Sequence, residues 1–496
     1  MTDFSTPQRQ SPIGVLVMFF DTVRQFARAF WPIALLYVFR EKSYDFLVIS
    51  VGVFGFIAVA GIAAYLKYLN FTFYIDAENN EFIISEGIFN KSKTAIQLEK
   101  IQQVNINQSL IQRIISVYEL DVDSAGSSNK EGMIKAVSHD LALALKAKLL
   151  DNAHRVSSGD STDANPSTAE TDSLINISLL SLLKIGITSN YIRSIGLILA
   201  FFVTVYENVR QLVNTESIDE AQLEQYLTQG FMARSLLIFV VMMLLLLLVI
   251  NILRTVVKFY GMHMTRQSGS LLLAYGLINK KSTILRPQRA QIAFVTRNFF
   301  QKRLDVSEIK IRQAGGGEGK QKNSIVEIPG CDEKERDAIM RLLYDVVPQK
   351  GIMLRPNIRK LIFSIFLSIV LPLGVFALVA INEPLLMEYV WIVPIYIALI
   401  GLIVYFSYRN YRLFVSEGFI IKQSGAWDVT NQIIEPAKIQ AVSTSQLFWH
   451  KGLNIGSLTL HTAGGNLDFQ LGEFDRMRQY VNHWLHEIET SDRNWM

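Results

Sequence analysis

The sequence predicts a multi-pass α-helical membrane protein that carries three copies of a small β-rich domain, and two observations point to this fold class. Half of the 496 residues are apolar and only 19% are charged. A low charged fraction with clustered apolar residues is typical of membrane proteins. A block of roughly sixty residues also occurs three times, each time after a pair of long apolar segments. Repetition at fixed spacing indicates that one small fold is used three times.

The three copies share fixed spacings around a basic residue. In each copy a glycine lies 13 positions before the basic residue, a glutamine two positions after it and a second glycine 26 positions after it. An apolar pair also recurs ten and eleven positions after it: Leu110 and Ile111, Phe299 and Phe300, Phe448 and Trp449. The recurring basic and glutamine positions form a candidate binding face: Lys100, Gln102, Arg289, Gln291, Lys438 and Gln440. A salt bridge that anchors a strand is the other interpretation of the basic position.

Six apolar segments, in three pairs, are candidate membrane spans: residues 27–39, 45–66, 191–206, 234–253, 361–381 and 389–408. Roughly 20 apolar residues are needed to cross about 30 Å of hydrocarbon, and all but the first and third segments meet this length easily. Residues 12–26 carry an apolar stripe at helical spacing. We therefore expect a helix in the membrane interface that runs into a short or tilted first span. A single long tilted helix is the alternative.

The charges around these segments predict their orientation. The loop between the third and fourth segments carries five acidic residues and one arginine, whereas basic residues precede the third and fifth segments and follow the fourth and sixth. The positive-inside rule then places both termini and all three repeats in the cytoplasm. The single cysteine, Cys331, excludes an intramolecular disulfide and fits a reducing compartment. The net charge of +4 is too small to indicate a nucleic-acid partner.

Each copy reads as short strands closed by a helix, most clearly the third. Residues 457–463 alternate apolar and polar side chains, and Gly464-Gly465 marks a turn. Residues 474–488 predict a closing helix with five residues on its packing face: Met477, Tyr480, Val481, Trp484 and Leu485. The other copies end in helical runs at about 140–152 and 333–346. Short strands with a C-terminal helix suit a partly open barrel.

The predicted domains follow from these patterns. They are an N-terminal tail and interfacial helix (1–26), a transmembrane hairpin (27–66), the first repeat (67–153), a disordered acidic linker (154–175), a second hairpin (176–256), the second repeat (257–348), a third hairpin (349–408) and the third repeat (409–490).

The repeat resembles bacterial pleckstrin-homology (PH) membrane proteins of the YdbS/YdbT type, in which a pair of transmembrane helices precedes a PH-like domain. The third copy carries the resemblance best, in Lys438-Ile-Gln-Ala-Val-Ser-Thr-Ser-Gln446, Lys451-Gly-Leu and Thr462-Ala-Gly-Gly465. The first copy keeps Lys100-Ile-Gln-Gln-Val, and the second departs most, with Arg289-Ala-Gln-Ile-Ala. The resemblance implies three PH-like domains, each a partly open β-barrel with a C-terminal helix, and a capacity for self-association.

No catalytic constellation is visible in the sequence. The glycine-rich run at 314–321 lacks the spacing of a phosphate-binding loop, so we expect a hairpin turn there. His483 and His486 lie on a packing helix without an acidic or cysteine partner, and we expect no metal site. We therefore expect no enzymatic activity, no cofactor and no small-molecule substrate.

Five basic residues of the second copy are candidate contacts to anionic lipid headgroups: Lys280, Lys281, Arg297, Lys302 and Arg303. A solvated face that only satisfies the positive-inside rule is the alternative.

The functional prediction is a non-enzymatic inner-membrane scaffold or docking protein. Its partners are membrane lipids and a protein partner or a second copy of the chain, and its setting is envelope stress or resistance to membrane-active peptides. The alternative is a component of a membrane transport or export system. The apolar segments hold few polar residues that such a path would need, and Asn251 and Ser368 are the ones we can name.

Overall fold

The computed structural model describes residues 4–40, 46–88, 90–124, 132–157, 173–189, 231–267, 270–314 and 325–490, with two isolated helical positions, 196 and 200. The predicted third span lies outside these residues, except for those two positions, and so does most of the predicted linker. The chain divides into two compact units. The first contains residues 1–174, 263–289 and 313–325, and the second contains residues 175–262, 290–312 and 326–496.

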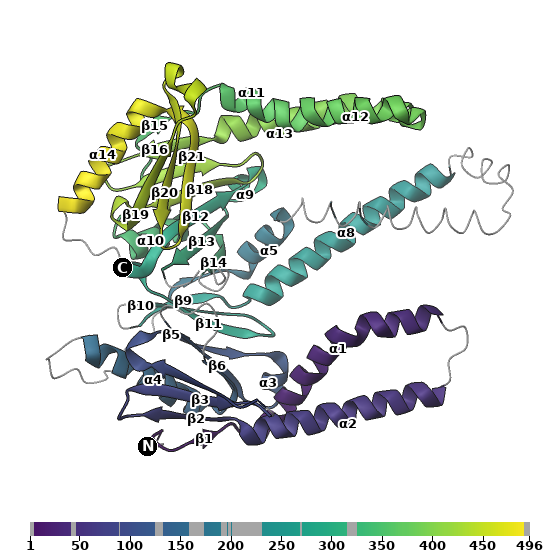
Figure 1. Cartoon of the computed structure of the whole chain (residues 1–496), viewed down its shortest axis with the longest axis vertical. Helices are drawn as coiled ribbons and strands as arrows, with labels where there is room; N and C mark the ends of the chain where they lie inside the picture. The colour runs from purple at the N-terminus through teal and green to yellow at the C-terminus, as the bar shows by residue number, and fades with distance from the viewer. Residues whose placement is uncertain are drawn as a thin grey trace. The chain divides into compact units, whose positions relative to one another are not determined.

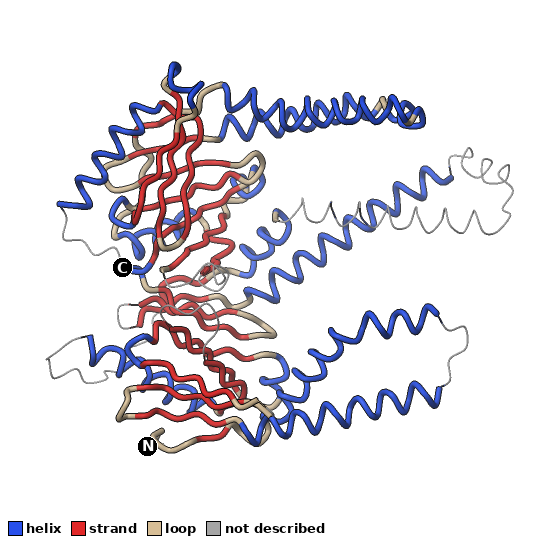
Figure 2. Tube along the Cα trace, viewed as in Figure 1, coloured by secondary structure: helices blue, strands red, loops and turns tan. Residues whose placement is uncertain are grey.

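The same order of elements occurs three times (Figures 1 and 2). A short strand precedes the helical hairpin, and three strands follow it. After a 3-10 turn, a further strand, a short helix, two more strands and a closing helix complete the repeat. In the first repeat these are β1 (Gln8–Arg9), α1 (Gly14–Arg40), α2 (Phe46–Asn70), β2 (Thr72–Asp76), β3 (Glu81–Glu86), β4 (Ser92–Gln97), η1 (Leu98–Lys100), β5 (Ile101–Gln108), α3 (Leu110–Ile114), β6 (Tyr118–Ser124), β7 (Gly132–Val137) and α4 (His139–Ser157).

The second and third repeats follow this order. The second contains β8 (Ser173–Asn176), α5 (Leu179–Thr188), α8 (Phe231–Phe259), β9 (His263–Gln267), β10 (Ser270–Tyr275), β11 (Lys280–Leu285), η2 (Pro287–Arg289), β12 (Ala290–Arg297), α9 (Phe299–Arg303), β13 (Ser307–Gln313), β14 (Ile325–Cys331) and α10 (Glu333–Tyr344). The third contains β15 (Ile352–Leu354), α11 (Arg359–Ile365), the π-turn η3 (Phe366–Val370), α12 (Leu371–Asn382), η4 (Pro384–Tyr389), α13 (Ile392–Asn410), β16 (Arg412–Val415), β17 (Ile420–Ser424), β18 (Val429–Ile434), η5 (Pro436–Lys438), β19 (Ile439–Ser445), η6 (Phe448–Leu453), β20 (Ile455–Thr462), β21 (Gly465–Glu473) and α14 (Phe474–Thr490).

Each repeat therefore contributes a four-stranded half and a three-stranded half, and the halves of successive repeats join. The described sheets contain four, seven, seven and three strands. In the first seven-stranded sheet, β5 of the first repeat pairs with β11 of the second, and in the other, β12 of the second repeat pairs with β18 of the third. The short strands β1 and β15 pair with β2 and β16, and β8 lies next to β9. The sequence patterns did not reveal these short strands, because two to four residues carry too little periodicity.

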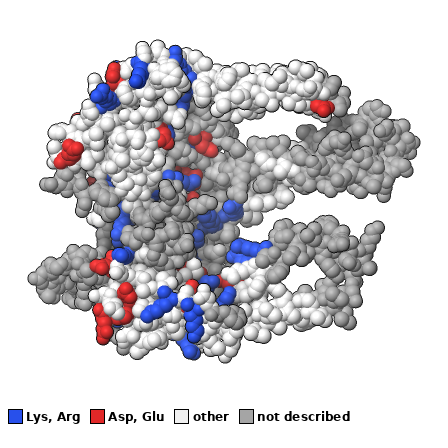
Figure 3. Space-filling model, viewed as in Figure 1, with Lys and Arg blue, Asp and Glu red and all other residues white. Residues whose placement is uncertain are grey.

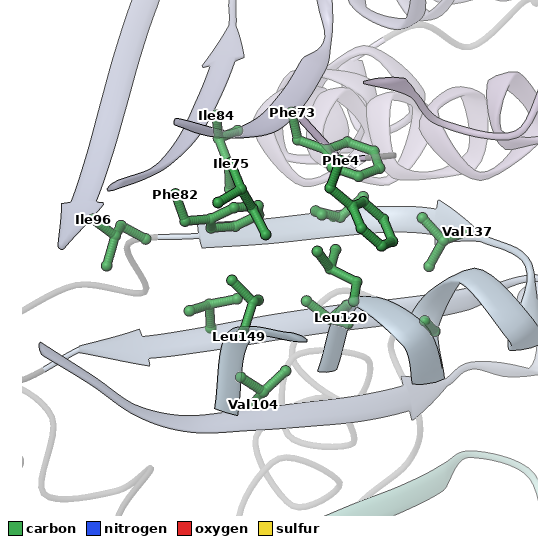
Figure 4. Packing of buried hydrophobic residues seen from close by; sticks show 14 of the residues in the cluster. Phe4, Phe73, Ile75, Phe82, Ile84, Ile96, Val104, Leu120, Val137 and Leu149 are labelled. Atoms are coloured by element: carbon green, nitrogen blue, oxygen red, sulfur yellow. The ribbon is translucent and has the colours of Figure 1, made fainter. Parts of the chain in front are cut away.

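The core of the first repeat lies between its strands and α4 (Figure 4). Alternate residues of β2 are buried, so Phe73 and Ile75 point inward from one face, as expected for a half-buried strand. Phe82 of β3 and Leu120 of β6 are fully buried beside them, and Leu149 of α4 reaches the same cluster. The closing helix thus covers the apolar face that the strands leave open.

The third repeat has an equivalent core around α14. Trp484 is 1% exposed, and the ring of Phe469 stacks on that of Tyr411 at 5.3 Å. The predicted packing face of this helix is correct for Met477, Val481 and Trp484, which are buried. It is wrong for Leu485, which is 41% exposed, because this residue lies one position past the buried stripe.

The short helix after the first strand of the three-stranded half begins with a capping box in two repeats. The side chain of Ser109 accepts from the Gln112 amide and that of Asn298 from the Gln301 amide, while each glutamine side chain accepts from the amide of the capping residue. These pairs satisfy amides that a helix start leaves open. In the third repeat Leu447 stands at the capping position and cannot accept, and the segment is the 3-10 turn η6.

Three described helices are long and apolar enough to cross a membrane: Val240–Phe259, Arg359–Asn382 and Ile392–Asn410. The last two form the third hairpin, and the face of it seen in Figure 3 is almost free of charge between its base and its tip. In the first hairpin, α1 is one continuous helix that packs along α2, and the apolar helix described in α2 is the shorter Phe54–Asn70. The described part of the chain is thus partly helical and partly β, with antiparallel sheets and apolar helices.

Candidate interaction surface: the repeat edges and the turns beside them

The recurring basic residue ends a 3-10 turn in every repeat, and the next residue starts a strand. Its surroundings differ between the copies. Lys100 is exposed, Arg289 is half-buried and Lys438 is only 8% exposed. Burial lowers the pKa of Lys438, and the charge of Glu435 opposes this effect. Burial also lowers the pKa of Arg289, with a contribution from neighbouring Arg286. The recurring basic residue is thus part of the turn that leads into the strand. Its charge is more exposed to solvent in the first repeat than in the third.

The exposure of the recurring glutamine depends on whether the next repeat packs on it. Gln291 on β12 is 1% exposed, because the turn between β20 and β21 of the third repeat packs on it. A Cβ added at Gly464 in that turn would lie 2.7 Å from the Cβ of Gln291, and Nη1 of Arg312 donates to the Gly464 carbonyl at 3.3 Å. On β19 of the third repeat, Gln440 is exposed. For Gln102 the structure describes the backbone in β5 and not the side chain. The six predicted residues are therefore equivalent positions of three modules.

Among the described strands that correspond to the junction between repeats, two lie at the end of their sheet. The strand β4 of the first repeat ends the four-stranded sheet, and β19 of the third repeat ends the three-stranded sheet. Their equivalents, β11 and β18 on one side and β5 and β12 on the other, are paired with a neighbouring repeat. Five of the seven β19 residues are exposed. An open edge of this kind offers unpaired backbone N–H and C=O groups to another strand.

The recurring apolar pair forms an exposed apolar turn in each repeat. The most exposed member is Leu110 in α3 of the first repeat, Phe299 in α9 of the second, and Phe448 in η6 of the third, which is 77% exposed, with Trp449 at 54%. In the second unit, α9 is fixed beside the end of α5: Nδ2 of Asn298 donates to the Thr188 carbonyl at 2.7 Å, and Nε2 of Gln301 donates to Oγ of Ser189 at 3.1 Å. Since α5 belongs to the second hairpin, these bonds place the apolar side chains of α9 where that hairpin leaves the sheet.

The five predicted lipid-contacting basic residues are divided between the two units. Lys280 and Lys281 lie on β11 in the first unit, opposite Gln108 and Asn107 of β5. In the second unit, Arg297 is paired with Asp305 at 2.7 Å, which neutralises its charge locally. Lys302 and Arg303 are exposed on α9, on the same short helix as the apolar pair.

A polar cavity of about 650 Å³ lies in the second unit, at the base of α8. It is lined by three basic and three acidic residues: Arg254, Lys258, Lys310, Glu308, Glu327 and Asp428. Lys258 pairs with Glu327 at 2.7 Å and Lys310 with Glu308 at 3.0 Å. Burial alone would lower the pKa of Lys310, but Glu308 raises it above its usual value. The balanced charges and mutual pairing are typical of a solvated structural cavity.

No group of three or more histidine, cysteine or acidic residues that could hold a metal ion occurs among the described residues. His483 and His486 are exposed on α14. Cys331 is fully buried in β14, and burial raises the pKa of its thiol, with Glu335 adding to the effect. A buried thiol of this kind is inert as a nucleophile.

Comparison with known proteins agrees with this architecture. The model of the bacterial PH domain matches three regions of the chain: 30–153, 208–347 and 365–487. Each region takes in part or all of a helical hairpin and the strands that follow it. The chain is also 23% identical over 395 residues to the UPF0699 transmembrane protein YdbT of Bacillus subtilis (strain 168). The aligned region covers 75% of this chain and 77% of that protein. Because the family model covers most of the sequence, the chain belongs to the bacterial PH domain family, as a membrane-associated member with three PH regions.

Proposed function

We propose that this protein is a non-enzymatic scaffold of the bacterial inner membrane that docks a protein partner on its PH-like repeats. The observation that carries this proposal is the open, exposed β19 edge of the third repeat, at a position where the first and second repeats are each covered by a neighbour. A surface that binds a protein domain twice within one chain is suited to binding a protein at its third occurrence. Strand addition to an open edge is a recurring mode of protein recognition.

The proposed placement is multi-pass, with the repeats on the cytoplasmic side. The second helix of each hairpin carries a basic residue in its last turn, just before its repeat: Lys67, Lys258 and Arg409. The tip of the third hairpin carries Glu383 between α12 and η4. Basic residues concentrate on the cytoplasmic side of short membrane loops, which supports this orientation.

The apolar turns are proposed to contact the bilayer surface. In α9, exposed Phe299 and Phe300 stand beside exposed Lys302 and Arg303, and the helix is fixed against the end of α5. Aromatic side chains favour the headgroup level, and basic residues there gain about 1 kcal/mol each from anionic lipid. Liposomes with brominated lipid test this: the lipid should quench the fluorescence of Trp449, read as the difference between the protein and a Trp449→Phe variant, and a Phe448→Ser change should reduce that quenching.

The docking proposal is tested by photocrosslinking in cells. A photoreactive amino acid at Gln440, on the open edge, should capture a specific protein, whereas the same group at His483, exposed on α14, should capture little. Absence of any protein adduct at Gln440 would count against docking at this face.

Turnover of a soluble substrate by the purified protein would contradict the non-enzymatic part of the proposal. A deletion strain challenged with membrane-active peptides tests the proposed role in envelope stress, and unchanged sensitivity would argue against it.

A second candidate function, as a component of a transport or export system, is favoured by the polar cavity and by Asn251, which lines it. The cavity lies at the end of the span Val240–Phe259, however, and its charged groups pair with one another. Transport sites lie near the middle of the membrane. Ser368 in the fifth span uses its carbonyl to accept from the hydroxyl of Tyr396 at 2.6 Å, which ties the two helices of the third hairpin together. Both observations fit anchoring helices better than a translocation path.

A further inference from the structure

The two junctions between repeats use the same register, although their side chains differ. At the first junction Gln108 faces Lys280 and Asn107 faces Lys281. At the second junction Arg297 faces Val429 and Thr296 faces Thr430. In both cases the residue eight positions after the recurring basic residue faces the residue four positions after the recurring glycine. The pairing is thus a property of the module and follows from the backbone ladder rather than from one set of side chains.

Among the strands that the structure describes, one copy of each half of this junction is open. The edge of β19 is equivalent to the paired edges of β5 and β12, and the edge of β4 is equivalent to the paired edges of β11 and β18. A second copy of the chain can therefore supply the strand that β19 lacks. The shared register places Gln446 opposite Lys91, Ser445 opposite Ser92 and Thr444 opposite Lys93 of that copy.

The composition of β19 is unusual for an edge that stays in solvent. Natural edge strands are protected by lysine, proline, inward-pointing charges or very short length. The seven residues of β19, Ile439-Gln-Ala-Val-Ser-Thr-Ser, contain no charge and no proline, and most are exposed. The edge of β4 carries one charge, Lys93, which is also exposed. In the shared register Lys93 would face the uncharged Thr444, so the pairing places no like charges opposite each other.

We infer that copies of this protein associate head to tail, with β19 of one chain adding to β4 of the next in the register of the internal junctions. The contact joins two different surfaces, so it propagates into a closed ring or an open array in the membrane. This inference rests on the proposed function, because it names a second copy of the chain as the partner of the scaffold.

Cysteine crosslinking in native membranes tests the pairing. Ser445→Cys and Ser92→Cys are placed in two differently tagged full-length chains, in which both positions are exposed and the natural Cys331 is buried. Directly opposed strand residues lie within disulfide range. Oxidation should yield a dimer that carries both tags.

The matched control uses Ser85→Cys in place of Ser92→Cys. Ser85 lies on the inner strand β3, which is already paired on both sides, so this variant should give no such dimer. A Thr296→Cys, Thr430→Cys chain, whose hydroxyls lie 2.9 Å apart, reports the internal junction under the same conditions.

A charge exchange provides a second readout that does not depend on oxidation. Thr444→Lys would place a lysine opposite Lys93 and should weaken self-association in liposomes about two- to five-fold. Adding Lys93→Glu to that chain should restore it, because the pair then has opposite charges. Both side chains are exposed, so folding should be preserved.

The outcomes are distinguishable from those of the docking proposal. Crosslinking of Ser445→Cys to Ser92→Cys together with the charge rescue supports head-to-tail association. Absence of that crosslink, while the internal junction crosslinks, overturns it. Capture of an unrelated protein at β19 with no second copy also overturns it and leaves the docking proposal standing.

Discussion

Replacement of Trp484 by alanine measures how strongly the closing helix stabilises the third repeat. The indole is 1% exposed, stacks on Tyr480 at 5.8 Å and belongs to the core cluster that contains Phe469. A buried aromatic side chain removes about 150–250 Å² from water. At about 25 cal/mol per Å² this gives an upper value of roughly 4–6 kcal/mol. Measured changes from a buried tryptophan to alanine cost about 3–5 kcal/mol, so we expect the opening free energy of this repeat to fall by that amount.

Hydrogen exchange of the full-length protein in detergent reads this change locally. The amides of β20 and β21 should exchange about two to nearly four orders of magnitude faster in Trp484→Ala, if they exchange through opening of the repeat. Leu485→Ala is the matched control, because the leucine is the next residue on α14 and is 41% exposed. Its effect should stay within a factor of ten. An equal acceleration in the two variants would refute the packing of α14 through Trp484.

Three further predictions follow from individual contacts. Burial raises the pKa of Tyr411 to about 12 from its usual 10. The contribution of the neutral Tyr411 side chain to the free energy of unfolding is therefore complete below pH 10 and is lost between pH 10 and 12. Tyr411→Phe should remove this part of the stability loss at alkaline pH, measured by thermal unfolding at a series of pH values. A Cβ at Gly464 would lie 2.7 Å from that of Gln291, so Gly464→Ala should lower the free energy of unfolding by about 1–3 kcal/mol. Gly452 has open space around it, so Gly452→Ala should leave the melting temperature unchanged in the same assay. Thr296→Val removes a 2.9 Å contact between the hydroxyls of Thr296 and Thr430 across the second junction and should lower stability by about 0.5–1.5 kcal/mol. Unchanged hydrogen exchange of the β12 and β18 amides would contradict a role for this contact.

Several features could be read from the sequence because they depend on local spacing. The module was recognisable from fixed distances between glycine, basic residue and glutamine, and these residues do occupy the same turn and strand in each repeat. The apolar helices were recognisable from continuous hydropathy, since bilayer thickness sets their length. The membership in a PH-domain family followed from the same motifs.

The tertiary structure decided which copies of a recurring position are buried and which are open. Gln291 and Gln440 have the same local motif, but only Gln291 is covered, by a turn more than 170 residues away in the chain. Sequence spacing also could not show that the β-strands of successive repeats pair, because an edge looks the same in sequence whether or not a neighbour covers it. Local periodicity therefore determined the module and its anchors. Long-range strand pairing determined that, among the described strands, β19 is left open where its equivalents β5 and β12 are paired with a neighbouring repeat.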